Sequence, residues 1–328
     1  GAGGAGEGLT GGRAERNPPR CAPRAAYRRS MTDDQYTFQD PSKMFADITP
    51  SAQYQEGAGL DAELDDRADH GETTYRGSGR LVGRKALVTG GDSGIGAAVA
   101  IAFAREGADV AISFLPEEQE DAARILALIE ETGQKGVGFA GDITSAEFSR
   151  SLVADAVSEL GGLDILVNNA GKQQFHEALT DISDEQFDET FKTNVYAMFW
   201  ISKAALPHLA PGSSIINTSS IQAYSPSETL VDYASTKAAI NTFSKALSQQ
   251  LAPKGIRVNV VAPGPIWTPL QTAGGQPTEA LPTVGEETPL GRWGQPAELA
   301  PAYVFLASGE SSFVIGETLH VNGGMPTP

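Results

Sequence analysis

The sequence predicts an α/β fold in which one parallel β-sheet is covered by helices on both faces. Between residues 81 and 324, short apolar runs suited to buried strands alternate with helix-length stretches, and a glycine-rich turn follows the first run. Such alternation is typical of right-handed βαβ units, whose parallel sheet lies between two helical layers. No linker-like stretch interrupts these residues. We therefore expect one doubly wound domain over 81–328.

Composition narrows the class of protein before any motif is considered. The 328 residues are 40% hydrophobic, which is enough for a full core. A formal net charge of −17 argues against a nucleic-acid partner, because phosphate binding needs clustered Lys and Arg. No apolar run approaches the ~18 residues of a membrane span, and the single cysteine, Cys21, is compatible with a reducing compartment. We expect a soluble, cytoplasmic protein.

The residues before the predicted domain fall into two segments. Residues 1–30 are rich in Gly and Arg and lack the apolar centre of a signal peptide, so we expect a disordered leader, translated upstream of Met31 or vector-derived. A transit peptide is a weaker alternative. Residues 31–80 are acidic and contain too few apolar groups to fold alone. They form either a solvated tail or an arm along the surface of the domain, and the scattered aromatics favour the arm: Tyr36, Phe38, Phe45 and Tyr54.

The expected elements of the domain follow one another regularly. We predict strands at 86–88, 110–112, 137–139, 165–167, 215–216, 258–261 and 318–321. We predict helices at 97–104, 117–132, 146–160, 184–209, 232–251 and 296–306. Sheets of this kind bind ligands at the carboxyl ends of their strands. The segment 271–289, rich in Gly and Pro, is expected to form a mobile lid there.

The stretch 85–97 contains the turn between the first strand and its helix. Gly90, Gly94 and Gly96 allow the backbone to approach a diphosphate closely, and the helix N-terminus offers free N–H groups. Three glycines also occur in ordinary βα turns. The turn alone is therefore a weak indication of a dinucleotide site.

Tyr233 and Lys237 lie four residues apart within a predicted helix, so their side chains share one helical face. A phenol with a pKa near ten is a poor acid–base catalyst at neutral pH, and a neighbouring cation lowers that pKa. Such a pair also occurs by chance on surface helices. Asn194 lies mid-helix, where Asn is disfavoured, and this predicts either a solvated face or a polar kink that holds an ordered water.

Several motifs in order resemble the classical short-chain dehydrogenase/reductase family. They cover 81–324 and comprise Thr-Gly-x-x-x-Gly-x-Gly at 89–96, Asp142, Asn-Asn-Ala-Gly at 168–171, Asn194, Ser220, Tyr-x-x-x-Lys at 233–237, Pro263-Gly264 and Asn-Gly-Gly at 322–324. The acidic arm is similar to that of an N-terminally extended bacterial subgroup with stress-associated and glucose/ribitol-dehydrogenase-like members. The resemblance implies a Rossmann-type fold, a homotetramer, and an oxidoreductase acting on an aldehyde, ketone or alcohol.

The resemblance also implies residue roles. Tyr233 would be the general acid or base, and Lys237 would lower its pKa and hold the nicotinamide ribose. Ser220, thirteen positions before Tyr233, would orient the carbonyl, and Asn194 would hold a water that connects Lys237 to solvent. The implied cofactor-binding residues, besides Tyr233 and Lys237, are Gly90, Asp92, Ser93, Gly94, Ile95, Gly96, Phe114, Leu115, Asp142, Ile143, Asn169, Ala170, Gly171, Pro263, Gly264, Ile266 and Thr268.

The choice of dinucleotide depends on the position that meets the 2′ group of the adenosine ribose. NAD-preferring members often end the second strand with an acid there, but this chain has Phe114. NADP-preferring members carry Arg or Lys nearby, but this chain has Leu115 and Ser93. Both cofactors stay open, and the missing cation favours NAD(H).

Two other functions stay open beside the hydride-transferring enzyme. One is a non-catalytic dinucleotide sensor or scaffold on the same fold, and the other is a dehydratase or epimerase. The four histidines are not spaced as metal ligands, so we expect no metal site: His70, His176, His208 and His320.

Overall fold

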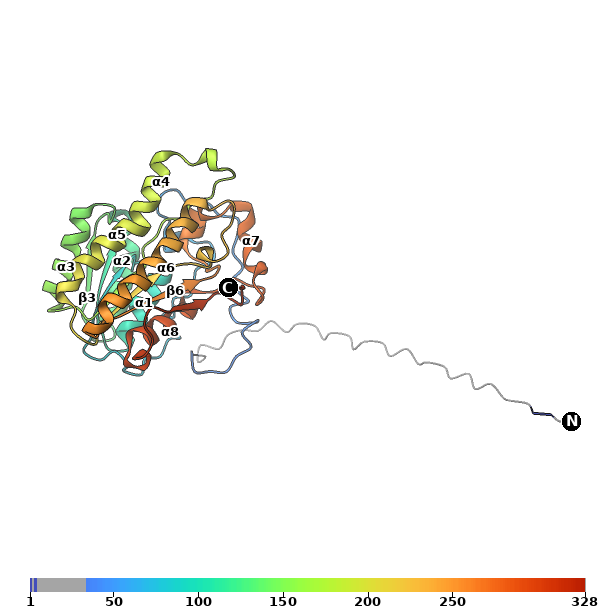
Figure 1. Cartoon of the computed structure of the whole chain (residues 1–328), viewed down its shortest axis with the longest axis horizontal. Coiled ribbons are helices and arrows are strands. Elements are labelled where there is room, and N and C mark those ends of the chain that lie inside the picture. Colours follow the sequence, from blue (N-terminus) through green and yellow to red (C-terminus); the bar gives the residue numbers. More distant parts are fainter. Residues whose placement is uncertain (2, 5–33, 328) are drawn as a thin grey trace.

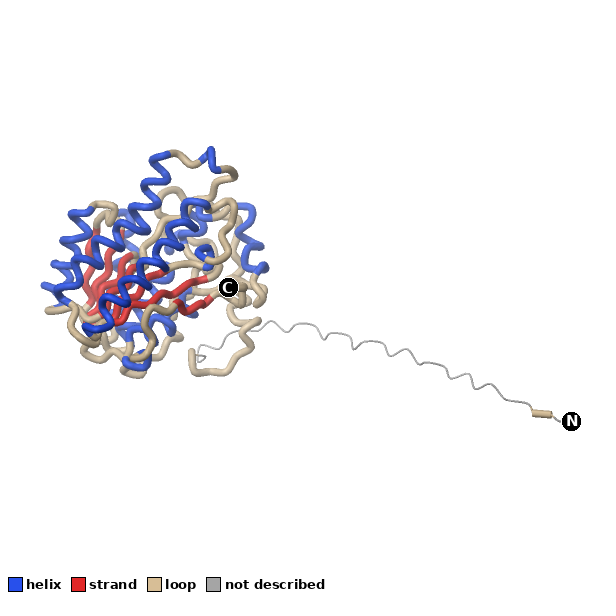
Figure 2. Tube along the Cα trace, in the orientation of Figure 1, coloured by secondary structure: helices blue, strands red, loops and turns tan. Residues whose placement is uncertain are grey.

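The structure is a computed structural model that describes residues 1, 3, 4 and 34–327; the predicted leader otherwise lies outside these residues. Seven strands form one parallel sheet in the order β3-β2-β1-β4-β5-β6-β7, drawn in red in Figure 2. They are β1 (Lys85–Thr89), β2 (Asp109–Phe114), β3 (Gly136–Ala140), β4 (Ile165–Asn168), β5 (Ser214–Thr218), β6 (Arg257–Pro263) and β7 (Thr318–Val321). The strand order reverses between β1 and β4, where sheets of this kind bind ligands.

Helices cover both faces of this sheet (Figure 1). One layer contains α1 (Gly94–Arg105), α2 (Gln119–Glu130) and α8 (Pro296–Ala307), and the other contains α3 (Ala146–Leu160), α5 (Ala197–Ala205) and α6 (Val231–Leu251). Strand β1 serves both layers, because Ala86 and Val88 belong to one core and Leu87 to the other. The predicted doubly wound fold is confirmed.

The predicted helix 184–209 is interrupted in the structure. It consists of α4 (Asp184–Phe191), a π-helical turn (Lys192–Tyr196) and α5, and Asn194 lies within the π-helical turn. The predicted lid also contains helical turns, at Gln271–Gly275, Thr278–Ala280, Gly285–Glu287 and α7 (Leu281–Val284). These turns pack against neighbouring residues, because Leu281 is buried in a cluster with Trp267 and Trp293.

The arm contacts its own domain at several places, one of them where Arg292 donates to the carbonyl oxygen of Pro41 at 2.8 Å. The expectation that aromatic side chains hold it is wrong for Tyr36, Phe38 and Tyr54, which are exposed, whereas Phe45 is buried. Polar contacts and a small apolar cluster hold the arm. Tyr75 donates to Glu106 at 2.7 Å, and Trp267 donates to the carbonyl oxygen of Asp66 at 2.6 Å. Leu64 and Ala68 pack in one cluster with Trp267. Over residues 34–327, no helix combines the length and apolar character needed to cross a membrane.

Candidate active site

One cavity of about 820 Å³ opens at the carboxyl ends of the strands, a volume typical of cofactor sites. Ser220, Tyr233 and Lys237 line it, as do the implied cofactor-binding residues with one exception. The exception is Gly96. A Cβ at this position would lie 1.8 Å from the carbonyl oxygen of Gly90, so glycine is needed for α1 to begin this close to the turn. Asn194 lies behind the cavity, in a small neighbouring pocket.

The glycine turn is fixed to the next strand across the switch point. Thr89, at the end of β1, accepts hydrogen bonds through its hydroxyl from the backbone N–H groups of Asn169 and Ala170 at 3.0 and 3.1 Å. The Asn169 amide donates back to the carbonyl oxygens of Thr89 and Gly90, each at 3.2 Å. These bonds hold the turn rigidly in front of the N-terminus of α1, so the free N–H groups of that helix face the cavity.

The candidate catalytic side chains come from two neighbouring elements. Ser220 follows β5, and its hydroxyl accepts from the backbone N–H of Gln222 at 3.2 Å, which leaves the hydroxyl proton free to be donated. Tyr233 and Lys237 lie one turn apart on α6, and both are buried. The Lys237 ammonium donates to the carbonyl oxygen of Thr218 at 3.0 Å and lies 5.3 Å from the Tyr233 ring centroid.

Asn194 has fully paired polar atoms, which explains an Asn in the middle of a helix. Its carbonyl oxygen accepts from the backbone N–H of Lys172 at 2.7 Å. Its amide donates to the carbonyl oxygen of Lys172 at 2.9 Å and to the Thr236 hydroxyl at 3.0 Å. A Cβ on Gly171 would lie 3.4 Å from Asn194 Oδ1 and 3.5 Å from Lys237 Nζ, so both groups reach the same small region.

Burial controls the protonation of the catalytic pair. It raises the pKa of Tyr233 to about 12, with a hydrogen bond from Ser220 acting in the opposite direction, and lowers the pKa of Lys237 to about 8. Lys237 was expected to lower the pKa of Tyr233. Instead, desolvation of the phenol sets the direction of the shift, and the group that acts against it is Ser220. The Lys237 ammonium is directed to the carbonyl oxygen of Thr218. Tyr233 is therefore protonated at neutral pH, as an acid must be.

Sequence reasoning named Asp92 but missed the two other acids beside the end of β2, Glu117 and Glu118. Glu118 reaches back to accept from the backbone N–H of Leu115 at 2.7 Å, and Glu117 and Asp92 line the same part of the cavity. Burial raises the pKa of Glu118 to about 7, and burial together with Glu118 raises that of Asp92 well above its ordinary value. The three-residue spacing from Leu115 to Glu118, typical of a capping box, could have indicated this turn.

Positive charge is sparse along the cavity wall. Among the described residues that line it, the only cationic side chains are Lys172 and Lys237. Lys172 is paired with Glu189 at 2.6 Å, and Lys237 lies beside Tyr233. The acids beside the end of β2 therefore lack a cationic partner among these lining residues, whereas Glu189 has Lys172.

Known proteins with similar sequences and structures agree with this geometry. A family model described as enoyl-(acyl carrier protein) reductase matches residues 90–326. The uncharacterized oxidoreductase YhxD of Bacillus subtilis is 54% identical over 300 residues, which cover 90% of this chain and all of that protein. Glucose and ribitol dehydrogenase of Daucus carota is 42% identical over 280 residues, covering 84% and 96% of the two chains.

A solved short-chain dehydrogenase from Burkholderia cenocepacia, in complex with NADP, superimposes with a TM-score of 0.70 at 35% identity and covers 75% of this chain and 98% of its own. The family model spans most of the chain, and the relatives match almost their whole length. The chain belongs to the short-chain dehydrogenase/reductase family of oxidoreductases.

Proposed function

We propose that the chain transfers a hydride between a nicotinamide dinucleotide and an aldehyde, ketone or alcohol. The observation that carries this proposal is that Ser220, Tyr233 and Lys237 line the same cavity as the glycine turn before α1. A cavity of about 820 Å³ with a helix N-terminus at its wall fits a dinucleotide. The bound dinucleotide supplies or accepts the hydride, and the protein holds the substrate and moves the proton.

The protein side of the reaction rests on three side chains. In the reducing direction Tyr233 gives its phenolic proton to the carbonyl oxygen, while the Ser220 hydroxyl donates a hydrogen bond to the same oxygen. Lys237, whose pKa is about 8, then returns a proton to the Tyr233 phenolate at neutral pH at a small cost in free energy. Asn194, through its hydrogen bonds to Lys172, holds the Lys172 backbone in place near Lys237.

We propose NAD(H) as the preferred cofactor, although the Burkholderia relative binds NADP. Phe114 ends β2 and Leu115 follows it, where folds of this type meet the adenosine ribose. Asp92, Glu117 and Glu118 line this part of the cavity. A 2′-phosphate would be repelled by Glu117 and by the ionised form of Glu118, and it would lack a cationic partner. A 2′-hydroxyl, in contrast, can donate to a carboxylate.

A panel of carbonyl compounds and polyols, assayed with NAD(H) and NADP(H) at 340 nm, tests both proposals. We expect turnover with at least one substrate class and at least about tenfold tighter binding of NADH than of NADPH. The Glu118→Gln variant should narrow this difference. Lowering the pH from 8 to 6 should do the same, because protonation of Glu118, whose pKa is about 7, removes its share of the repulsion.

The other outcomes of the panel would change either the proposed cofactor or the proposed function. Tighter binding of NADPH would overturn the cofactor preference alone. Binding of both cofactors without any absorbance change would favour the non-catalytic sensor or scaffold. Product formed without consumption of NADH would favour a dehydratase or epimerase.

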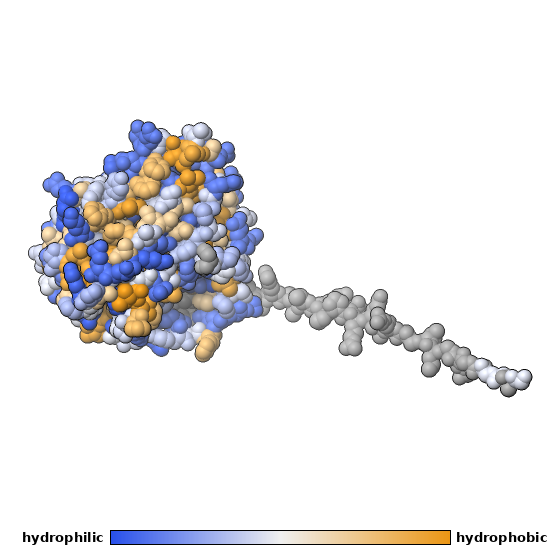
Figure 3. Space-filling view, in the orientation of Figure 1, coloured by the Kyte–Doolittle hydropathy of each residue, from blue (hydrophilic) through white to orange (hydrophobic). Residues whose placement is uncertain are grey.

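We also propose that the chain forms a homotetramer. Exposed aromatic side chains on α4, the π-helical turn and α5 support a contact surface: Phe187, Tyr196 and Phe199. Figure 3 shows hydrophobic residues in a broken band across the helices on the viewed face. Sedimentation equilibrium should give four times the chain mass, and a monomer at micromolar concentration would contradict the proposal.

A further inference from the structure

Part of the N-terminal arm forms a wall of the cavity. The segment 55–62, called the strap below, places Gly57 and Ala58 among the residues that line the cavity together with Ser93 and Glu118. Neither Gly57 nor Ala58 donates its backbone N–H to another group among the described residues. The arm was expected only to lie along the surface, so its presence at the cavity is a new element of the site.

The strap is attached to both sides of the cavity. At one end the backbone N–H of Gln55 donates to the carbonyl oxygen of Thr272, in the predicted lid, at 3.0 Å. At the other end Asp121 of α2 accepts from the backbone N–H groups of Asp61 and Ala62 at 2.7 and 3.2 Å. The strap therefore connects the segment after β6 to the helix after β2 and crosses between them.

The strap has a defined shape of its own. The buried Gln55 side chain closes it, donating to the carbonyl oxygen of Leu60 at 3.2 Å and accepting from the Leu60 backbone N–H. Gly59 has a φ of +78°, and a Cβ there would lie 2.9 Å from the carbonyl oxygen of Pro269. Only glycine permits both this conformation and this close approach to the lid.

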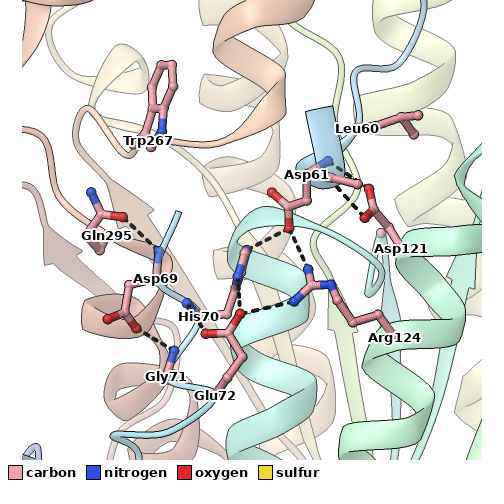
Figure 4. Close-up of polar contacts among 12 residues, drawn as sticks. Leu60, Asp61, Asp69, His70, Gly71, Glu72, Asp121, Arg124, Trp267 and Gln295 are labelled. Atoms are coloured by element: carbon pink, nitrogen blue, oxygen red, sulfur yellow. Dashed lines mark hydrogen bonds and ion pairs between the residues drawn. The ribbon is translucent and has the colours of Figure 1, made fainter. Parts of the chain in front are cut away.

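A buried charge cluster fixes the C-terminal end of the strap (Figure 4). The His70 ring lies between Asp61, at 2.8 Å, and Glu72, at 3.1 Å. Arg124 of α2 contacts both carboxylates, at 3.2 and 3.1 Å. Burial lowers the pKa of His70, but Asp61 and then Glu72 outweigh it and raise the pKa to about 10. The imidazolium form, and with it the anchor, is therefore present at neutral pH.

We propose that the strap is the outer wall of the dinucleotide site and retains the bound cofactor. The proposal rests on the dinucleotide binding proposed above. Gly57 and Ala58 present backbone, without charge, toward the cavity between α1 and the lid. Because both ends of the strap are held by hydrogen bonds, the cofactor leaves only when one of these ends opens. The N-terminal extension then sets the rate of cofactor exchange.

The Asp121→Ala variant tests this proposal. Asp121 accepts the hydrogen bonds from the backbone N–H groups of Asp61 and Ala62 but does not line the cavity. In the full chain, stopped-flow displacement of NADH should show a dissociation rate at least about tenfold higher than that of the wild type. The matched control is Glu120→Ala, which removes an exposed carboxylate from the same turn of α2 and should stay within about twofold.

Other outcomes separate this proposal from the proposed function. An unchanged dissociation rate in a folded Asp121→Ala variant, with a lower melting temperature, would reduce Asp121 to a structural role and overturn the proposal. If Asp121→Ala does not fold, the Gln55→Ala variant tests the proposal by the same measurement. It removes the side-chain hydrogen bonds between Gln55 and Leu60 that close the strap. A wild-type chain that binds neither NADH nor NADPH would instead overturn the proposed function.

Discussion

Replacing Tyr233 by Phe should lower kcat at least about a thousandfold while leaving the Kd for the cofactor within about threefold. The phenol lines the same cavity as the Ser220 hydroxyl, and its pKa of about 12 keeps it protonated throughout the neutral range. Removing one oxygen from a buried ring leaves its packing in place. Steady-state turnover and fluorescence titration with NADH measure the two effects separately.

The matched control for this variant is Tyr224→Phe. Tyr224 lies in a neighbouring turn, packs edge-on against His320 and does not line the cavity. We expect its activity to stay within about twofold of wild type. Full activity in Tyr233→Phe would exclude Tyr233 as the proton donor. Loss of cofactor binding in the same variant would instead assign Tyr233 to binding.

The Glu106→Ala variant should lower the free energy of unfolding by about 3–5 kcal/mol. Glu106 lies at the C-terminal end of α1 and is fully buried. It accepts from the Tyr75 hydroxyl at 2.7 Å, from the Arg80 guanidinium at 2.7 Å and from the backbone N–H of Ser78 at 2.9 Å. Its removal takes the buried acceptor away from all three of these donors of the arm. Urea denaturation measures the change.

The control removes the other acid near the same guanidinium. Glu310 lies 3.7 Å from Arg80 and is half exposed, so Glu310→Ala should cost less than about 1 kcal/mol. Equal losses in the two variants would mean that Arg80, and not the buried carboxylate, organises this contact.

Acid should act on the wild type through the same carboxylate. Burial raises the pKa of Glu106, but hydrogen bonds from Arg80, then Tyr75 and Ser78, outweigh it and lower the pKa to about 2. A depressed pKa stabilises the fold above the ordinary value of 4.5, and this stabilisation is lost as the pH falls toward 2. The stability of Glu106→Gln should depend less on pH over this window. Parallel curves for the two proteins would contradict this assignment.

The fold and the core of the site were predictable because they depend on local pattern. Apolar runs and helix-length stretches define the sheet, and the motifs around Tyr233 and Gly94 fall where strands end. The break at Asn194 was also visible, since Asn is unfavourable within a helix. Each of these signals lies within a few residues of the feature it predicts.

The features of the site and of the arm that were not predicted depend on contacts between residues far apart in the sequence. The contact of Glu118 with Leu115 is local, but Glu118 meets Asp92 at the cavity only because β1 and β2 lie side by side in the sheet. His70 looks like an ordinary surface histidine until Asp61 and Arg124 are placed around it. The aromatics of the arm were misleading, because Tyr36 and Phe38 contribute little burial whereas Glu106 binds the arm through polar groups.

The position of the arm has a consequence for the order in which the chain assembles. A ribosome releases the arm first, but the groups that bind it come later: Glu106, Asp121, Trp267 and Gln295. The backbone N–H of Asp69 donates to Gln295, 226 positions further along. The arm therefore cannot complete its docking until nearly the whole sheet has been synthesised. The arm is synthesised before the domain but is among the last segments to reach its final position. The cavity gains its outer wall only at that stage.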